Sequence, residues 1–223
     1  MTIHFLPISG PLLDKIQTYR TPTELRQFEI CTQTDSLFVN LNYLAELSEY
    51  FHVIRTGSYT EQASQKVILD DVFTEELVLF LSYVCPDGYK FDRTINEQNI
   101  NSLIYFSDRL MFPWVKEDVK EYLRRAEFQS TPFDTETLIQ LCYLLHSQSS
   151  HGGEEEEEID AVFRKIALLK DHDLVKDLVD SIPDVDSRNY AMKKIMFFRP
   201  YSRPPRPQIF FNWDDTYSHL YDD

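Results

Sequence analysis

The sequence predicts an α+β fold, in which a helix-rich domain with a small sheet is followed by an all-helical extension and an extended tail. Alternation of apolar and polar residues over 27–33 predicts a strand with one buried face, whereas apolar residues elsewhere mostly recur every three or four positions, as in amphipathic helices. With 223 residues, 43% of them apolar, the chain can bury a sizeable core. We expect an arm at 1–26, the domain at 27–130, the helical extension at 131–198 and the tail at 199–223.

The N-terminal arm carries four apolar residues at helical spacing: Leu12, Leu13, Ile16 and Tyr19. They can line one face of a short helix that needs a partner surface. Two interpretations stay open at this point. The helix packs back onto its own domain, or it is exchanged across a homodimer, in which case these four residues are the dimer contacts.

Three short strands are predicted. In Gln27 to Gln33, Phe28, Ile30 and Thr32 point to one side of the strand. Thr34-Asp35 is typical of a turn, and Ser36 to Asn40 gives a second strand, so the two form a hairpin. Lys66 to Leu69 is the third strand.

Four helical stripes follow the hairpin in the same domain. Their apolar or small residues are Leu41, Leu44, Leu47, Phe51 and Ile54, then Leu77, Phe80, Leu81 and Val84, then Ile100, Leu103, Ile104, Ser107, Leu110 and Met111, then Val115, Val119, Tyr122 and Leu123. Gly57 ends the first helix. Because several helices separate few strands, we expect the helices to cover the sheet.

Beyond Thr131-Pro132 the pattern is wholly helical, except for a polar stretch at 147–158. This stretch contains Gly152-Gly153 and five consecutive glutamates, which do not bury enough apolar surface to become ordered. We therefore predict a flexible acidic loop there.

The tail combines prolines with aromatic residues. Prolines keep such a segment extended, and Phe210, Phe211, Trp213 and Tyr217 are more aromatic residues than a spacer needs. The tail either lies in a groove of this chain or binds a partner, and both interpretations stay open.

Net charge and cysteine content indicate which partners and which cellular compartment to expect. A formal net charge of −15 repels phosphate backbones, so we expect no direct binding to nucleic acid. Three widely separated cysteines indicate a reducing compartment. No apolar run approaches the roughly 20 residues that cross a bilayer, and no secretory signal is recognisable. We expect a location in the cytoplasm, the nucleus or both, without membrane contact.

We expect no enzyme chemistry, no cofactor and no metal. Only five glycines are present, and no phosphate-binding loop is formed. Cys142 and His146 lie four residues apart but lack further ligands in a metal-site pattern. His172 lies between two aspartates without a nucleophile motif, and it is better explained as the start of a helix.

The order of elements and several short strings resemble the BTB/POZ family. The strings are Leu37-Phe38-Val39-Asn40 with Leu44, Ser48, Tyr50 and Phe51, then Val67-Ile68-Leu69-Asp70-Asp71-Val72, then Asn99-Ile100, Leu103, Ser107-Asp108 and Leu110. Two positions depart from the family pattern. Asn40 stands where a histidine is usual, although it can still form hydrogen bonds, and Cys85-Pro86-Asp87 replaces a common Tyr-Thr-Gly turn.

The resemblance also implies partners. Tyr59-Thr60-Glu61 is similar to the hydrophobic-any-glutamate motif with which many BTB adaptors bind a cullin, and the later helices resemble the BACK-like extension that widens this contact. We therefore expect a cullin-binding surface at Phe51, Ile54, Tyr59 and Glu61, an unknown target protein as second partner, and a homodimer. The alternatives are an unspecialised exposed loop at 59–61 and a self-associating scaffold without ubiquitination.

Overall fold

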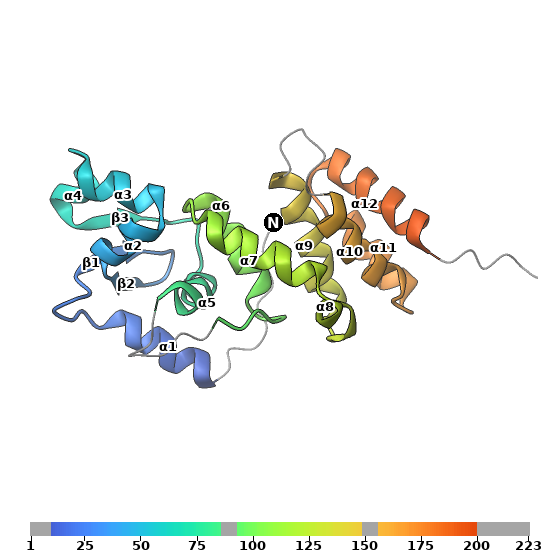
Figure 1. The fold of residues 1–223 in the computed structure, drawn as a ribbon, viewed down its shortest axis with the longest axis horizontal. Helices are drawn as coiled ribbons and strands as arrows, with labels where there is room; N and C mark the ends of the chain where they lie inside the picture. The colour runs from blue at the N-terminus through green and yellow to red at the C-terminus, as the bar shows by residue number, and fades with distance from the viewer. Residues whose placement is uncertain (1–9, 86–92, 149–155, 200–223) are drawn as a thin grey trace, which may run out of the picture.

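A computed structural model of the chain describes residues 10–85, 93–148 and 156–199, which contain twelve helices and three strands (Figure 1). The sheet-bearing part comprises α1 (Gly10–Arg20), β1 (Phe28–Cys31), β2 (Ser36–Val39), α2 (Leu41–Leu47), α3 (Glu49–Thr56), α4 (Thr60–Ser64), β3 (Lys66–Ile68), α5 (Thr74–Val84), α6 (Ile100–Arg109), α7 (Pro113–Arg124) and α8 (Ala126–Ser130). The extension comprises α9 (Thr135–Gln148), α10 (Glu156–Ala167), α11 (His172–Asp180) and α12 (Val185–Phe198). Over the described residues the predicted fold class, a helix-rich α+β domain followed by a helical extension, is confirmed.

The sheet has the strand order β2-β1-β3. β1 and β2 pair antiparallel with Phe28 opposite Val39, so the predicted hairpin is confirmed. β1 and β3 pair parallel with Ile30 opposite Val67. A parallel pair needs a crossover connection, which here contains β2 followed by α2, α3 and α4. Asn40 accepts a hydrogen bond of 3.1 Å from the Tyr43 backbone N–H and so caps α2.

Buried aromatic rings join the sheet to the central helices, beginning with Phe28 of β1, whose ring centroid lies 6.4 Å from that of Phe51. The Phe112 ring lies 5.1 Å from the Phe80 ring and 6.2 Å from the Phe51 ring, measured between centroids. Phe112 follows Met111, which has a positive φ of 53°. The prediction that Met111 belongs to the buried helical stripe is wrong, because α6 ends at Arg109 and the Met111 side chain is half exposed.

The N-terminal helix α1 packs onto its own domain, against α5 and β2. Ile16 and Tyr19 are buried there, Leu12 is partly buried, and Leu13 is exposed. An ion pair of 2.7 Å between Arg20 and Asp35 closes the end of the helix. Within one chain, the first of the two interpretations of the arm therefore holds.

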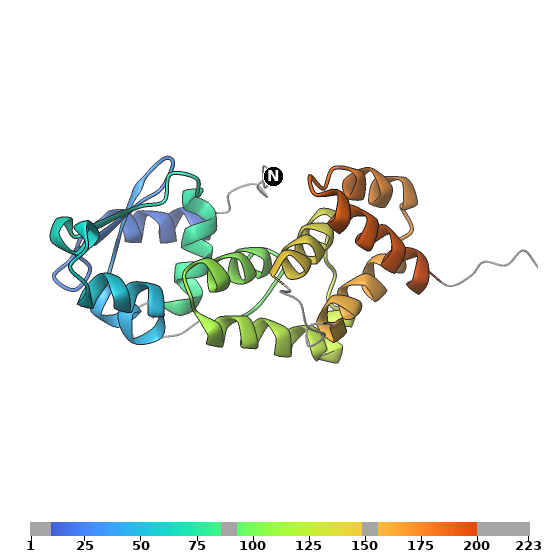
Figure 2. The same ribbon diagram turned by 90° about the horizontal axis from the view of Figure 1, so that it is seen from above.

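The helical extension lies at the opposite end of an elongated molecule from the sheet (Figures 1 and 2). α9 packs against α6, and α10 packs against α7. Glu158 at the start of α10 is fully buried and pairs with Arg124 of α7. The predicted boundaries of the acidic loop are wrong at both ends, because Ser147 belongs to α9 and the last three glutamates of the run belong to α10.

Some predictions fall on residues outside the described ranges. They include the fate of the aromatic tail residues, which are Phe210, Phe211, Trp213 and Tyr217. Within the described ranges, no helix combines the length and the apolar character that crossing a membrane would require.

Candidate partner-binding surface

Tyr59 lies at the corner between α3 and α4. Gly57 ends α3, with its backbone N–H donating a 2.9 Å hydrogen bond to the carbonyl oxygen of Val53. The Tyr59 ring folds back over this glycine, so that a Cβ at position 57 would lie 2.4 Å from two ring carbons. Nevertheless 54% of Tyr59 is exposed. The missing side chain at Gly57 therefore allows the ring to lie against the corner while its outer face stays open to solvent.

Glu61 lies in the first turn of α4, two residues after Tyr59, and is half buried. Burial raises the pKa of the Tyr50 hydroxyl, and the nearby Glu61 carboxylate raises this pKa further. A hydrogen bond of 2.8 Å from Gln62 Nε2 to the carbonyl oxygen of Arg55 holds α4 on the end of α3. An exposed aromatic ring and a carboxylate are thus presented from one fixed corner.

Phe51 and Ile54 do not reach this surface. Both are buried in the core, and the Phe51 ring lies edge-on to Tyr50 with centroids 5.2 Å apart. The prediction that they touch a partner directly does not fit the structure, because a partner would have to open the core to reach them. They instead belong to the buried face of α3, the helix that ends at this corner.

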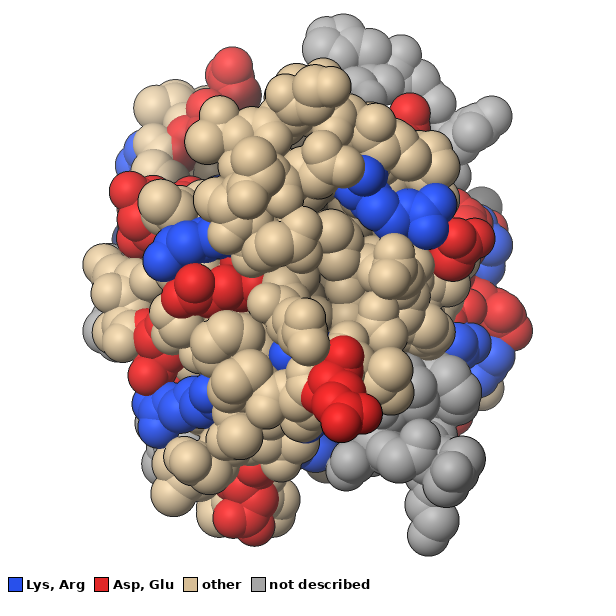
Figure 3. Space-filling model, turned by 90° about the vertical axis from the view of Figure 1, so that its left-hand side faces the viewer, with Lys and Arg blue, Asp and Glu red and all other residues tan. Residues whose placement is uncertain are grey.

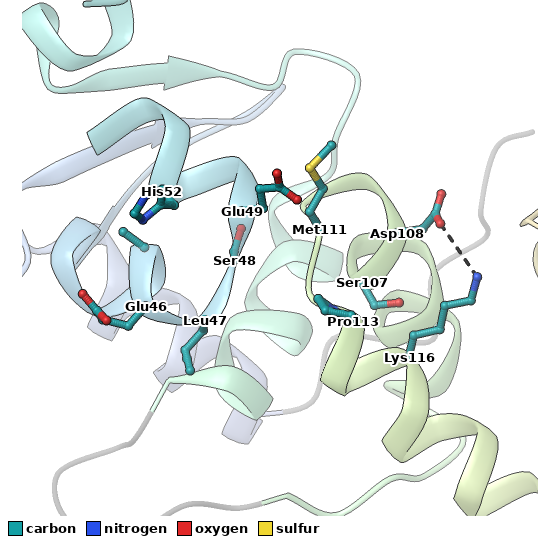
Figure 4. A pocket seen from close by; sticks show the side chains of 11 residues that line it. Glu46, Leu47, Ser48, Glu49, His52, Ser107, Asp108, Met111, Pro113 and Lys116 are labelled. Atoms are coloured by element: carbon teal, nitrogen blue, oxygen red, sulfur yellow. Dashed lines mark ion pairs between the residues drawn. The ribbon is translucent and has the colours of Figure 1, made fainter. Parts of the chain in front are cut away.

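A hollow of about 560 Å³ lies between the α2–α3 junction and the α6–α7 junction (Figure 4). At its base, the Ser48 hydroxyl donates a 2.6 Å hydrogen bond to the carbonyl oxygen of Leu110 and accepts one of 3.2 Å from the Phe51 backbone N–H. Glu49 and His52 lie on one side of the hollow, and Lys116 lies on the other.

This hollow was not predictable from the sequence. It brings residues 45–52 together with residues 107–116, and no local pattern reports a contact over such a separation. One signal pointed towards it: Ser48 and Ser107 are small polar residues at buried positions of apolar stripes. Such residues are found where a hydroxyl has a fixed partner.

The end of the molecule that carries the sheet is mostly uncharged. Figure 3 shows that uncharged side chains occupy most of this face, with charged side chains scattered among them and along the edges. Exposed apolar residues here are Val53, Tyr59 and Ile68. The exposed apolar side chains at this end therefore come from α3, from the α3–α4 corner and from β3.

His146 packs against another ring, whereas His172 is an exposed residue at a helix start. His146 stacks on Tyr190 with ring centroids 4.3 Å apart, and its Nδ1 lies 3.0 Å from the Ser187 hydroxyl. His172 begins α11, and the preceding Asp171 caps that helix through the Leu174 backbone N–H. No cluster of three potential metal ligands is found in the parts of the chain that the structure describes.

The sheet-bearing part of the chain is similar to a known protein family. Residues 19–127 match the family model described as BTB/POZ domain. This range begins near the end of α1 and closes within α8, so it includes the sheet, the Tyr59 corner and the hollow. A search of the curated proteins found no match.

Proposed function

Because residues 19–127 form a BTB/POZ domain, which is generally a module for protein interaction, we propose that this chain is an adaptor that links a target protein to a cullin-based ubiquitin ligase. The adaptor itself performs no bond chemistry. It raises the local concentration of the target near the ubiquitin-loading machinery.

The observation that carries the proposal is the fixed corner with an exposed Tyr59 and, two residues later, Glu61. The Tyr59 ring would fill an apolar pocket of the cullin, and an aromatic anchor of this kind often dominates binding energy. The Glu61 carboxylate would accept charge-assisted hydrogen bonds from the cullin. The hollow beside the α2–α3 junction offers room for a further cullin side chain.

The target protein would be held by the helical extension or the tail. α9 to α12 form a continuous packed unit with the BTB/POZ domain through α6 and α7. A target bound there would keep a fixed position relative to the cullin surface. This fixed position favours transfer of ubiquitin to the same region of the target each time.

The proposal is tested by measuring the affinity of the full chain for the N-terminal region of a cullin by isothermal titration calorimetry. Tyr59→Ala with Glu61→Ala removes both anchors. The matched control is Phe197→Ala with Glu127→Ala, which removes an exposed ring and an exposed carboxylate from α12 and α8. Circular dichroism establishes that each variant is folded.

We expect the corner variant to bind at least about 30-fold more weakly, because loss of an aromatic hot spot typically costs about 2 kcal/mol or more. The control variant should bind like the wild type. A folded wild-type chain that does not bind the cullin would remove the adaptor proposal, and so would equal losses in the two variants.

A self-associating scaffold is the second candidate function, favoured by the 55% exposure of Leu13 on α1. Its neighbours Ile16 and Tyr19 are already buried within the chain, so Leu13 is the member of the predicted dimer set that is available to another copy. Light scattering on the wild type and on Leu13→Lys tests this. A dimer that dissociates in the variant supports the scaffold, and a wild type that stays monomeric at high concentration opposes it.

A further inference from the structure

A second cavity, of about 250 Å³, lies where the BTB/POZ domain meets the helical extension. Asp71, Phe73 and Glu76 line it from the start of α5 and the segment before it. Tyr105 lines it from α6, and Gln140, Tyr143 and Leu144 line it from α9. The cavity is thus built jointly by the domain and the extension.

Glu76 is an unusual group to find in this wall. Only 7% of the residue is exposed, and its Oε1 atom is buried without a hydrogen-bond partner among the described residues. Burying a carboxylate without a partner is costly, and most buried polar groups in proteins are satisfied. An unsatisfied carboxylate oxygen beside a cavity therefore marks a position where a donor from outside is needed.

Arg109, beside the cavity, and Gln140, in its lining, donate to other groups. Arg109 binds both carboxylate oxygens of Asp71 at 2.6 and 2.7 Å and also donates to the Tyr105 hydroxyl. Gln140 donates through Nε2 to Glu136 at 3.2 Å, and its Oε1 accepts a bond of 3.1 Å from Asn101. The described lining therefore offers Glu76 no positive charge of its own.

We propose that this cavity binds a primary alkylammonium group, such as the end of a lysine side chain or a free amine, with the Glu76 carboxylate as its counter-ion. Two aromatic residues in the lining, Phe73 and Tyr143, have side chains of the kind that attracts a cation through the ring face, whereas the Tyr105 ring already has the Arg109 guanidinium over it at 5.7 Å. A compact ammonium with three donors suits one unsatisfied oxygen, whereas a guanidinium prefers two oxygens at once.

The titration of Glu76 gives the site a testable pH dependence. Burial, together with a smaller contribution from the neighbouring Glu75 carboxylate, raises the pKa of the Glu76 carboxyl to about 7. The other charged groups nearby are Asp71 and Arg109, which neutralise each other. A cation binds the ionised carboxylate, so binding should strengthen as the pH rises through about 7, and binding below that pH should release a proton.

The site is tested with the full chain and two cationic probes, n-butylammonium and lysine capped at both ends, with n-butanol as the neutral control. Binding is followed by NMR titration of amide signals in amine-free buffer at pH 6 and pH 8. Glu76→Gln removes the charge and keeps the shape. Glu75→Gln removes a neighbouring charge on the same helix and is the matched control.

We expect n-butylammonium to shift signals around the cavity, with affinity in the millimolar range that a ligand of this size allows. Glu76→Gln should weaken binding on the order of tenfold or more at pH 8, while Glu75→Gln changes it little, because the charge-assisted bond is lost only in the first variant. The affinity of the wild type should fall at pH 6. Binding of both probes supports a lysine of a partner polypeptide, and binding of n-butylammonium alone supports a free amine.

Three results would overturn the assignment. They are absence of binding by either cationic probe at pH 8, binding of n-butanol as strong as that of n-butylammonium, and equal affinities of the Glu76→Gln and Glu75→Gln variants. None of these depends on whether the Tyr59 corner binds a cullin.

Discussion

Gly57 is the residue on which the geometry of the Tyr59 corner depends most directly. Its φ of −79° and ψ of 170° are accessible to any residue, so Gly57→Ala is not opposed by backbone conformation. The added Cβ would instead lie 2.4 Å from the Tyr59 ring and 2.7 Å from the carbonyl oxygen of Val53. We expect the ring to be displaced and the free energy of unfolding to fall by about 1 to 2 kcal/mol, as for other overpacked sites.

Urea denaturation measures this change, with Ser58→Ala as a control at the neighbouring exposed position. If the Tyr59 corner is the cullin surface, Gly57→Ala should also reduce cullin affinity. A variant that is as stable as the wild type would show that the ring and the end of α3 adjust freely, and that the glycine is not needed there.

Glu76 determines how one part of the stability depends on pH. Its pKa is raised to about 7 in the folded protein, so the folded state holds this proton more tightly than the unfolded chain does. The resulting contribution to stability is complete below the ordinary pKa of a glutamate and is lost as the pH rises through about 7. Glu76→Gln, which does not titrate, should therefore be more stable than the wild type at pH 8 by about 1 to 2 kcal/mol and should lose this advantage at pH 5.

Chemical denaturation of both proteins at pH 5 and pH 8, in buffer without amines, measures the difference. Glu75→Gln should show no comparable pH-dependent gain. A constant difference between Glu76→Gln and the wild type over this range would mean that Glu76 titrates as an ordinary surface carboxyl.

At the scale of elements, Ser48 connects α3 to the end of α6. Its hydroxyl caps the first turn of α3 and also binds the carbonyl oxygen of Leu110, and the residue is buried. Ser48→Ala leaves that carbonyl oxygen and the Phe51 backbone N–H without this partner. We expect the free energy of unfolding to fall by about 1 to 3 kcal/mol, which combines loss of a cap with loss of a buried hydrogen bond. Hydrogen exchange should quicken at the start of α3, whereas Ser58→Ala should leave both quantities unchanged.

Most elements were predictable because the signals that define them are local. Phe28 and Ile30 alternate with polar residues, and both lie buried on one side of β1. The elements were misjudged where a distant contact decides the outcome. The glutamates at the start of α10 belong to a charged run, and such runs are typical of solvent-exposed segments. Glu158 nevertheless pairs with Arg124 of α7 and is buried. Met111 continues a helical period beyond the residue at which the backbone leaves the helix.

At the scale of the whole molecule, the candidate sites also fall into two groups: those that a local sequence signal predicts and those that only distant contacts create. Tyr59 and Glu61 are two residues apart, so a resemblance in the sequence was sufficient to select them. Phe51 and Ile54 were selected with them, but a helical stripe does not reveal whether its face meets a partner or the core. The Glu76 cavity was not predicted at all, because α5, α6 and α9 meet only in the folded chain.

Lys165 of α10 provides one of the polar contacts that attach the extension to the domain. Its Nζ lies 2.7 Å from the carbonyl oxygen of Phe128 and 3.3 Å from that of Gln129, so it satisfies carbonyl groups in α8, and it also lies 4.9 Å from the centre of the Phe128 ring. Burial lowers the pKa of this ammonium, so part of its interaction with α8 compensates the cost of burying its charge. Lys165→Met keeps the apolar stem and removes the donors. We expect the free energy of unfolding to fall by about 1 to 3 kcal/mol, and amide protection to be lost first in α8 and α10.

Hydrogen exchange followed by mass spectrometry measures this loss, with Lys170→Met, at an exposed position, as the matched control. Because α10 also packs against α9, whose Tyr143 lines the Glu76 cavity, loosening of α10 should weaken n-butylammonium binding as well. Loss of protection in α8 and α10 with an intact cavity would show that α9 is held by α6 alone. Unchanged protection in both helices would show instead that the extension is held by its apolar contacts without Lys165.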